Sequence, residues 1–94
     1  MPEDAVPAQL ALRPDDLKWT ATDEGVTVLD LRTARYLQLN RSGALLWERL
    51  SVGASVDELG EALVQRFGID LDRARHDVNE FVSALRERGF LSAE

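Results

Sequence analysis

Hydrophobic and polar residues first alternate along this chain and then recur at helical spacing, so strands are predicted to precede helices. Residues 17–22 (LKWTAT) alternate, residues 23–25 (DEG) supply turn chemistry, and residues 26–31 are apolar on both faces, as in a central strand. After a short connection at residues 32–34, residues 35–39 (RYLQL) alternate again. These spacings predict a three-stranded antiparallel meander whose first and third strands form its edges.

Three helices are predicted after the third strand. Asn40 or Ser42 can cap the first helix, residues 55–58 (SVDE) form a capping box for the second, and Asp70 can cap the third. One α+β domain ordered βββααα follows from this pattern. Each helix is expected to end at a glycine, namely Gly53, Gly68 and Gly89.

The third strand has a free edge in this arrangement, because no later strand is available to pair with it. Such an edge carries unpaired backbone N–H and C=O groups, and proteins either blunt it or use it to capture another chain. The use of this edge is therefore the main functional question.

The domain is predicted to span residues 15–94, preceded by a flexible arm. Residues 1–14 contain all three prolines and show no sustained hydrophobic period. The chain has no apolar run near the roughly 18 residues that a membrane span needs, and its start lacks signal-peptide blocks. We therefore expect a cytoplasmic protein without a membrane partner.

The residue types argue against catalysis and against cofactors. The chain of 94 residues has no cysteine, so it lacks a disulfide framework, a thiolate nucleophile and a cysteine metal site. The single histidine, His76, cannot form a metal site by itself, and no carboxylates are spaced as an acid and base pair. A protein that is not an enzyme, holding no metal or cofactor, is expected.

The net charge of −6 disfavours binding to nucleic acid, which gains much of its affinity from neutralised phosphates. Only residues 25–53 are locally basic, with four arginines against two acids. These arginines form either a small anion-attracting patch or an ordinary solvated face. They are Arg32, Arg35, Arg41 and Arg49.

Four segments in this order resemble the small PqqD-like domains known as RiPP recognition elements. They read LDLRTARYLQLN, SGALLWERL, SVDELGEALVQRFG and DVNEFVSALRERGFL, and the similarity covers about four-fifths of the chain. Within that family, the chain looks most like the stand-alone leader-binding proteins of lasso peptide pathways. It departs from the family at Ala34, where glycine is usual. Because positive φ disfavours alanine, either the loop is wider here or Ala34 adopts ordinary backbone angles.

The resemblance implies a winged-helix-turn-helix-like fold and a non-catalytic adaptor. Family members bind the leader segment of a ribosomally made precursor peptide, which adds as a strand to the third β-strand, in a groove against the last helix. They present the precursor to a separate leader-cleaving cysteine protease, and a cyclase is a further candidate partner. Two alternatives stay open: a winged-helix DNA-binding regulator and an assembly module that pairs with its own copy.

Ten candidate leader-binding residues follow, five on the third strand and five on the last helix. They are Arg35, Tyr36, Leu37, Gln38, Leu39, Arg73, Ala74, Asp77, Val78 and Phe81.

The strand candidates each have a second interpretation. Leu37 and Leu39 share one face, which in a sheet of this kind normally faces the core. Tyr36, on the opposite face, either stacks on a leader side chain or covers the sheet. Arg35 either pairs with an acidic leader residue or is an ordinary exposed arginine.

The helix candidates also allow two interpretations. Val78 and Phe81 follow the apolar spacing of a core-facing stripe, and Ala74 is small enough to form the floor of a groove. Asp77 either pairs with Arg73 one turn earlier or accepts a hydrogen bond from a bound leader.

Overall fold

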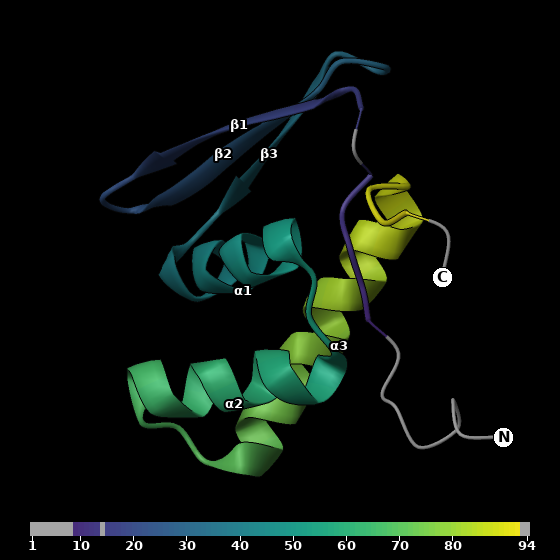
Figure 1. The fold of residues 1–94 in the computed structure, drawn as a ribbon. Coiled ribbons are helices and arrows are strands. Elements are labelled where there is room, and N and C mark those ends of the chain that lie inside the picture. The colour runs from purple at the N-terminus through teal and green to yellow at the C-terminus, as the bar shows by residue number, and fades with distance from the viewer. Residues whose placement is uncertain (1–8, 14, 93–94) are drawn as a thin grey trace, which may run out of the picture.

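The computed structural model describes residues 9–13 and 15–92, and it confirms the predicted βββααα order (Figure 1). A three-stranded sheet lies over one helix, the second helix lies on the other side of that helix, and the third runs alongside both (Figure 1). The elements are β1 (Leu17–Thr22), β2 (Gly25–Asp30), β3 (Arg35–Leu39), α1 (Arg41–Val52), α2 (Val56–Phe67) and α3 (Leu71–Arg88).

The sheet is antiparallel with β2 in the centre, so β1 and β3 are its edges. Val28 lies opposite Leu37 of β3, and Val26 lies opposite Leu39. Both valines are buried, which places the two leucines on the core face of the sheet. Gln38 and its partner Thr27 lie on the other face, where their side chains are hydrogen-bonded at 3.4 Å.

The predicted caps start the three helices. Asn40, not Ser42, caps α1, since its side chain accepts from the N–H of Gly43 at 2.9 Å. The capping box of α2 is formed, because Ser55 and Glu58 each accept from the other's backbone N–H. Asp70 caps α3, since its side chain accepts from the N–H of Arg73 at 2.8 Å, so local sequence sets where each helix begins.

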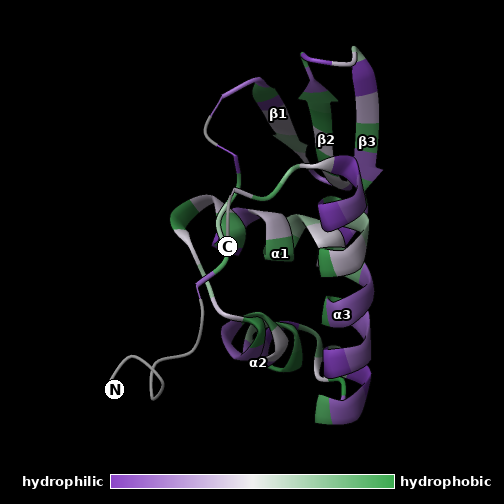
Figure 2. Cartoon of the chain, turned by 90° about the vertical axis from the view of Figure 1, so that its right-hand side faces the viewer, coloured by the Kyte–Doolittle hydropathy of each residue, from purple (hydrophilic) through white to green (hydrophobic). Residues whose placement is uncertain are grey.

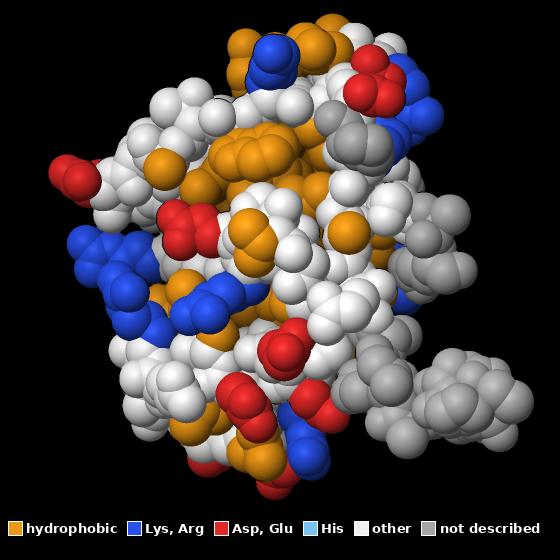
Figure 3. Space-filling model, in the orientation of Figure 1, with side chains coloured by type: hydrophobic (Ala, Val, Ile, Leu, Met, Phe, Trp, Pro, Cys, Tyr) orange, Lys and Arg blue, Asp and Glu red, His pale blue; other side chains and the backbone are white. Residues whose placement is uncertain are grey.

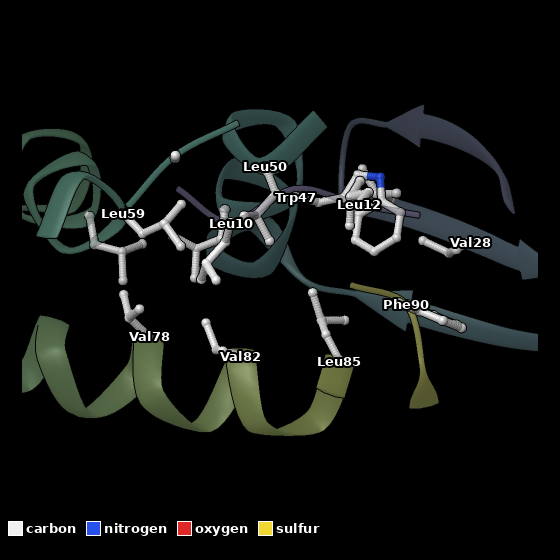
Figure 4. Close-up of a cluster of buried hydrophobic side chains, with 14 of the residues drawn as sticks. Leu10, Leu12, Val28, Trp47, Leu50, Leu59, Val78, Val82, Leu85 and Phe90 are labelled. Atoms are coloured by element: carbon white, nitrogen blue, oxygen red, sulfur yellow. The ribbon is translucent and has the colours of Figure 1, made fainter. Parts of the chain in front are cut away.

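The hydrophobic core includes Trp47 of α1, which is fully buried (Figure 4). Its ring meets Phe90 edge to face, with the centroids 6.1 Å apart, and Trp19 in the same manner at 5.4 Å. Trp19 keeps 43% of its surface exposed. Figure 2 shows that α3 turns its apolar residues toward α1 and α2 and presents mostly polar residues outward.

Residues 9–13 belong to the packed domain, although the sequence placed them in the flexible arm. Leu10 exchanges two backbone hydrogen bonds with Ala54, and Leu12 forms a β-bridge with Leu91. Both leucines are buried in the core. The arm prediction is therefore wrong for residues 9–13, while residues 1–8 and 14 lie outside the described part of the chain.

The loop between β2 and β3 contains no glycine, yet one of its residues still adopts a positive φ. Ala34 has a φ of 59°, so it adopts the left-handed conformation that the sequence analysis expected alanine to avoid. Its N–H donates to the carbonyl of Asp30 at 2.7 Å, which closes the loop. The hairpin thus keeps a turn suited to glycine while carrying an alanine.

Ala34→Gly is expected to raise the free energy of unfolding by up to about 1 kcal/mol, because glycine tolerates the left-handed region. Thermal or urea unfolding measures this change. The matched control is Ala84→Gly at an exposed position of α3, which should lower the free energy of unfolding by about 0.5–1 kcal/mol. A loss of stability in Ala34→Gly would show that the positive φ carries no strain.

Candidate functional site

The outer edge of β3 is unpaired within the described sheet, because β3 pairs with β2 alone. Leu37 and Leu39 are half-buried and pack against the core, so both retain some accessible surface. Tyr36 is 65% exposed on the opposite face of the sheet. A strand added to this edge would therefore contact backbone groups, apolar side chains below and Tyr36 above.

A hollow of about 440 Å³ lies between the end of β3 and the first half of α3. We call it the Leu39 hollow. Leu39 and Phe81 are apolar members of its wall, while Gln38 is a polar one. The remaining lining residues are Asn40, Ser42, Gly43, Leu46, Leu63, Arg73, Asp77 and Glu80.

A second hollow, of about 660 Å³, lies between the start of β3 and the last turns of α3. We call it the Arg35 hollow. Ala84 supplies a small exposed side chain from α3, with Glu87 and Arg88 beside it. Its other lining residues are Asp30, Thr33, Arg35 and Phe90. Because α3 lines the two hollows in the reverse order to β3, helix and strand run antiparallel here, and we call the two hollows together with the β3 edge between them the β3–α3 groove.

The structure brings together six of the ten residues that the sequence analysis nominated. Five of them line the Leu39 hollow and one lines the Arg35 hollow. Tyr36 and Leu37 lie on β3 between the two. The six are Gln38, Leu39, Arg73, Asp77, Phe81 and Arg35. Their role in binding stays a prediction.

Ala74 and Val78 are fully buried, so they belong to the core and not to the accessible surface of the groove. They lie on the side of α3 that faces the core, together with Val82 and Leu85. The nominated contact with a ligand is therefore not available to these two side chains as the domain stands.

Ion pairs on α3 follow one-turn spacing. Arg73 and Asp77 pair at 3.5 Å, as one of the two interpretations from the sequence expected. The Nε2 atom of His76 lies 3.3 Å from a carboxylate oxygen of Glu80, also one turn later. Asp77 is the half-buried member of the first pair, and it lines the Leu39 hollow.

Sequence reasoning missed Ala84, Glu87 and Arg88 as groove residues. A helix face repeats at three or four residues, so positions 77, 81, 84 and 88 share one side of α3. Helical spacing thus places Ala84 and Arg88 on the same side as Asp77 and Phe81, whereas the apolar stripe of α3 faces the core.

Asp30 is a buried carboxylate at the end of β2, next to the Arg35 hollow. Burial acts to raise its pKa, but several favourable partners outweigh this effect and hold the pKa below the ordinary value of 3.8. These are the N–H of Arg32 at 3.0 Å, the side chain of Thr33 and the guanidinium of Arg13 at 3.2 Å. The carboxylate therefore stays ionised in the folded protein at neutral pH.

The lowered pKa of Asp30 predicts a loss of stability in acid. The folded state favours the ionised form of Asp30. Its contribution to the free energy of unfolding is therefore complete above about pH 4 and disappears as pH falls through the folded-state pKa. Melting temperatures of wild type and Asp30→Asn between about pH 7 and pH 2 measure it. The variant should be less stable at pH 7 and converge on wild type in acid. A difference in melting temperature between wild type and Asp30→Asn that is the same at every pH would contradict the prediction.

The locally basic residues do not form one patch. Arg41 lines a hollow of about 530 Å³ beside the β1–β2 turn, together with Arg66 and Phe67. Figure 3 shows Lys and Arg side chains gathered at this side of the molecule, near the start of α1 and the end of α2. Arg35 and Arg49 line two other hollows, which favours the interpretation as a solvated face.

Two further properties bear on the kind of site. No described helix is both long enough and apolar enough to cross a membrane. Within residues 9–13 and 15–92, no three acidic or histidine side chains are grouped as a metal ion would require.

Two solved structures share this fold over nearly the whole chain. One, described as "Lasso peptide synthetase B1 complexed with the leader peptide", is 31% identical with a TM-score of 0.78. The match covers 92% of this chain and 100% of that one. The other, "TbiB1 in Complex with the TbiA(beta) Leader Peptide", is 24% identical with a TM-score of 0.80 and covers 89% and 96% of the two chains.

No curated protein sequence matches the chain. The family model of "Coenzyme PQQ synthesis protein D (PqqD)" matches residues 25–91, which run from the start of β2 to just beyond α3. The resemblance seen in the sequence is thereby confirmed over more than half of the chain. This chain belongs to the PqqD family.

Proposed function

We propose that this protein is a RiPP recognition element, which binds the leader segment of a ribosomally made precursor peptide, as its lasso-pathway relatives do. The leader adds as a fourth strand to the free edge of β3 and lies in the β3–α3 groove. The observation that carries the proposal is an unpaired strand edge facing a helix across two hollows. The leader peptides in the two similar structures support it.

The dimensions of the edge suit a short extended peptide. Arg35–Leu39 spans five residues, which at roughly 3.4 Å per residue gives an edge about 17 Å long. Backbone bonds along this edge would give affinity that depends little on sequence, and the hollows would accept alternate side chains. The Leu39 hollow has both apolar and charged residues in its wall, among them Phe81, Arg73 and Asp77, so it suits a side chain with an apolar body and a polar end.

The bound precursor would then be presented to a maturation enzyme. We propose a separate leader-cleaving cysteine protease as that enzyme, with a cyclase as a further partner. This protein contributes no reacting group in such a scheme, because its part is to hold the leader and raise the local concentration of precursor at the protease. Cleavage should therefore depend on this protein kinetically, while the chemistry stays with the protease.

Titration with a synthetic leader, taken from a precursor gene beside this protein's gene, tests the proposal. Fluorescence anisotropy should show one-to-one binding at about micromolar affinity or tighter. Light scattering of the free protein and a gel shift with duplex DNA run in parallel. A stable homodimer that excludes leader would favour self-pairing of the β3 edge, and salt-dependent DNA binding without leader binding would favour a regulator.

Tyr36→Ala and Asp77→Ala are expected to weaken leader binding by about threefold to tenfold each, since truncated contact residues commonly lose this much. Tyr36 is exposed, and the Arg73–Asp77 pair is worth only about 0.3–0.5 kcal/mol, so both melting temperatures should stay near wild type. The control is Asn79→Ala, which is exposed on α3 and lines neither hollow. Unchanged affinity in both variants would place the leader elsewhere.

A further inference from the structure

The two walls of the β3–α3 groove, β3 and α3, are not consecutive in the chain. The distance between them at the Arg35 hollow must therefore be fixed by contacts between the elements. At the other end of the groove, β3 runs through Asn40 directly into α1. At the Arg35 hollow, the β2–β3 hairpin loop stands opposite the last turn of α3. A change of angle there would narrow or widen the space for an added strand.

Arg13 joins these two walls through one side chain. Its guanidinium pairs with the carboxylate of Asp30 at 3.2 Å, on the hairpin side. It also donates to the carbonyl of Gly89, the residue that ends α3. It makes a third donation, to the carbonyl of Asp15 at 3.2 Å. The guanidinium carbon also lies 6.0 Å from the centroid of the Phe90 ring.

The link is rigid, because it is buried and made by several bonds. The side chains of Arg13 and Asp30 are only 16% and 4% exposed. The backbone N–H of Arg13 also donates to the carbonyl of Phe90 at 2.7 Å, so its main chain is fixed to the end of α3 as well. A planar guanidinium with diverging donors suits this three-way contact, which a lysine ammonium does not reproduce.

Asp30 connects the contacts of Arg13 to the free edge of β3. It is the register partner of Arg35, the first residue of β3. Its carboxylate accepts from the N–H of Arg32, and its carbonyl accepts from the N–H of Ala34. The position of Asp30 thus sets both the loop and the start of β3, and Asp30 itself lines the Arg35 hollow.

We propose that Arg13 is a positioning residue for leader binding: through Asp30 and Gly89 it holds the β2–β3 hairpin at the distance from α3 that admits a peptide strand. This inference rests on the proposed function. It assigns a binding role to a residue that touches no leader and lies outside the segment matched by the family model.

Leader affinity of Arg13→Ala, Arg13→Lys and Asp30→Asn tests the proposal at a temperature well below each melting transition. Arg13→Ala and Asp30→Asn should bind the synthetic leader about tenfold more weakly, a typical coupling for residues in one network. Arg13→Lys should recover part of the loss, because it restores the charge but not all three donations. The matched control is Ser55→Ala, which removes the α2 cap outside both hollows and should lower the melting temperature without changing affinity.

A purely structural role for Arg13 gives a different result. The variants would then melt earlier, as Ser55→Ala does, yet bind leader as tightly as wild type when folded, and the positioning role would be overturned. If Arg13→Ala does not fold, Arg13→Lys and Asp30→Asn decide the question by the same comparison. A wild-type protein that binds no leader would instead reject the proposed function itself.

Discussion

Ala84→Trp is expected to weaken leader binding by about a hundredfold, which corresponds to about 2.7 kcal/mol. Ala84 is exposed on α3 and lines the Arg35 hollow opposite the start of β3. An indole ring at this position would occupy the space that an added strand needs, and a leader would have to displace it or lose its contacts there. Anisotropy titration with the synthetic leader measures the loss.

Stability should hardly change in Ala84→Trp, because the new ring replaces an exposed side chain and disturbs no core contact. The matched control is Ser83→Trp, since the neighbouring residue is exposed, lines neither hollow and points about 100° away around the helix. It should bind leader as wild type does. Equal affinity in the two tryptophan variants would show that the groove is not the leader site.

Gly25→Ala is expected to destabilise the domain by about 3 kcal/mol or more, the range of severe single substitutions. Gly25 has a φ of 155°, which side chains rarely adopt, and a Cβ atom there would lie 1.7 Å from the carbonyl oxygen of Leu39. That oxygen belongs to backbone at the end of β3, so it cannot move aside as a flexible side chain could. The start of β2 and the end of β3 would have to separate.

Gly60→Ala provides the opposite case within the same chain. Gly60 lies inside α2, and a Cβ atom there would meet nothing within 4 Å. Alanine should therefore stabilise the helix by about 0.5–1 kcal/mol. Urea unfolding of Gly25→Ala and Gly60→Ala measures the expected loss and gain in the free energy of unfolding. A Gly25→Ala protein as stable as wild type would mean that β3 does not approach β2 as closely as described.

Local signals made the elements predictable from the sequence. The caps at Asn40, Ser55 and Asp70 and the alternation of Arg35–Leu39 depend on residues close together in the chain, so order and approximate bounds followed. Ala34 was harder, because its positive φ is imposed by closure of the hairpin against its intrinsic preference.

Contacts between distant segments could not be read from the chain. Leu10 pairs with Ala54 in the α1–α2 connection and Leu12 pairs with Leu91 after α3, and no hydrophobic period marks residues 9–13 as core. The Arg13–Asp30 pair has the same character, since either residue alone is an ordinary surface type. The sequence prediction of a flexible arm failed there for this reason.

The free edge of β3 and the helix beside it were easier to predict from the sequence than the residues that line the two hollows. The free edge follows from strand order alone, and the side of α3 that faces it was approximately identified. Helical periodicity leaves the border between core and groove uncertain by one position, which is why Ala74 and Val78 were nominated while Ala84 was not.

Hydrogen exchange of the backbone amides, followed by NMR with and without the synthetic leader, tests strand addition to β3 most directly. Leader should slow exchange at the outward-facing amides of Arg35–Leu39, because those N–H groups gain acceptors. The free edge of β1, Leu17–Thr22, is the internal control and should exchange at its original rate. Protection along β1, or leader binding without any new protection along β3, would contradict strand addition to β3.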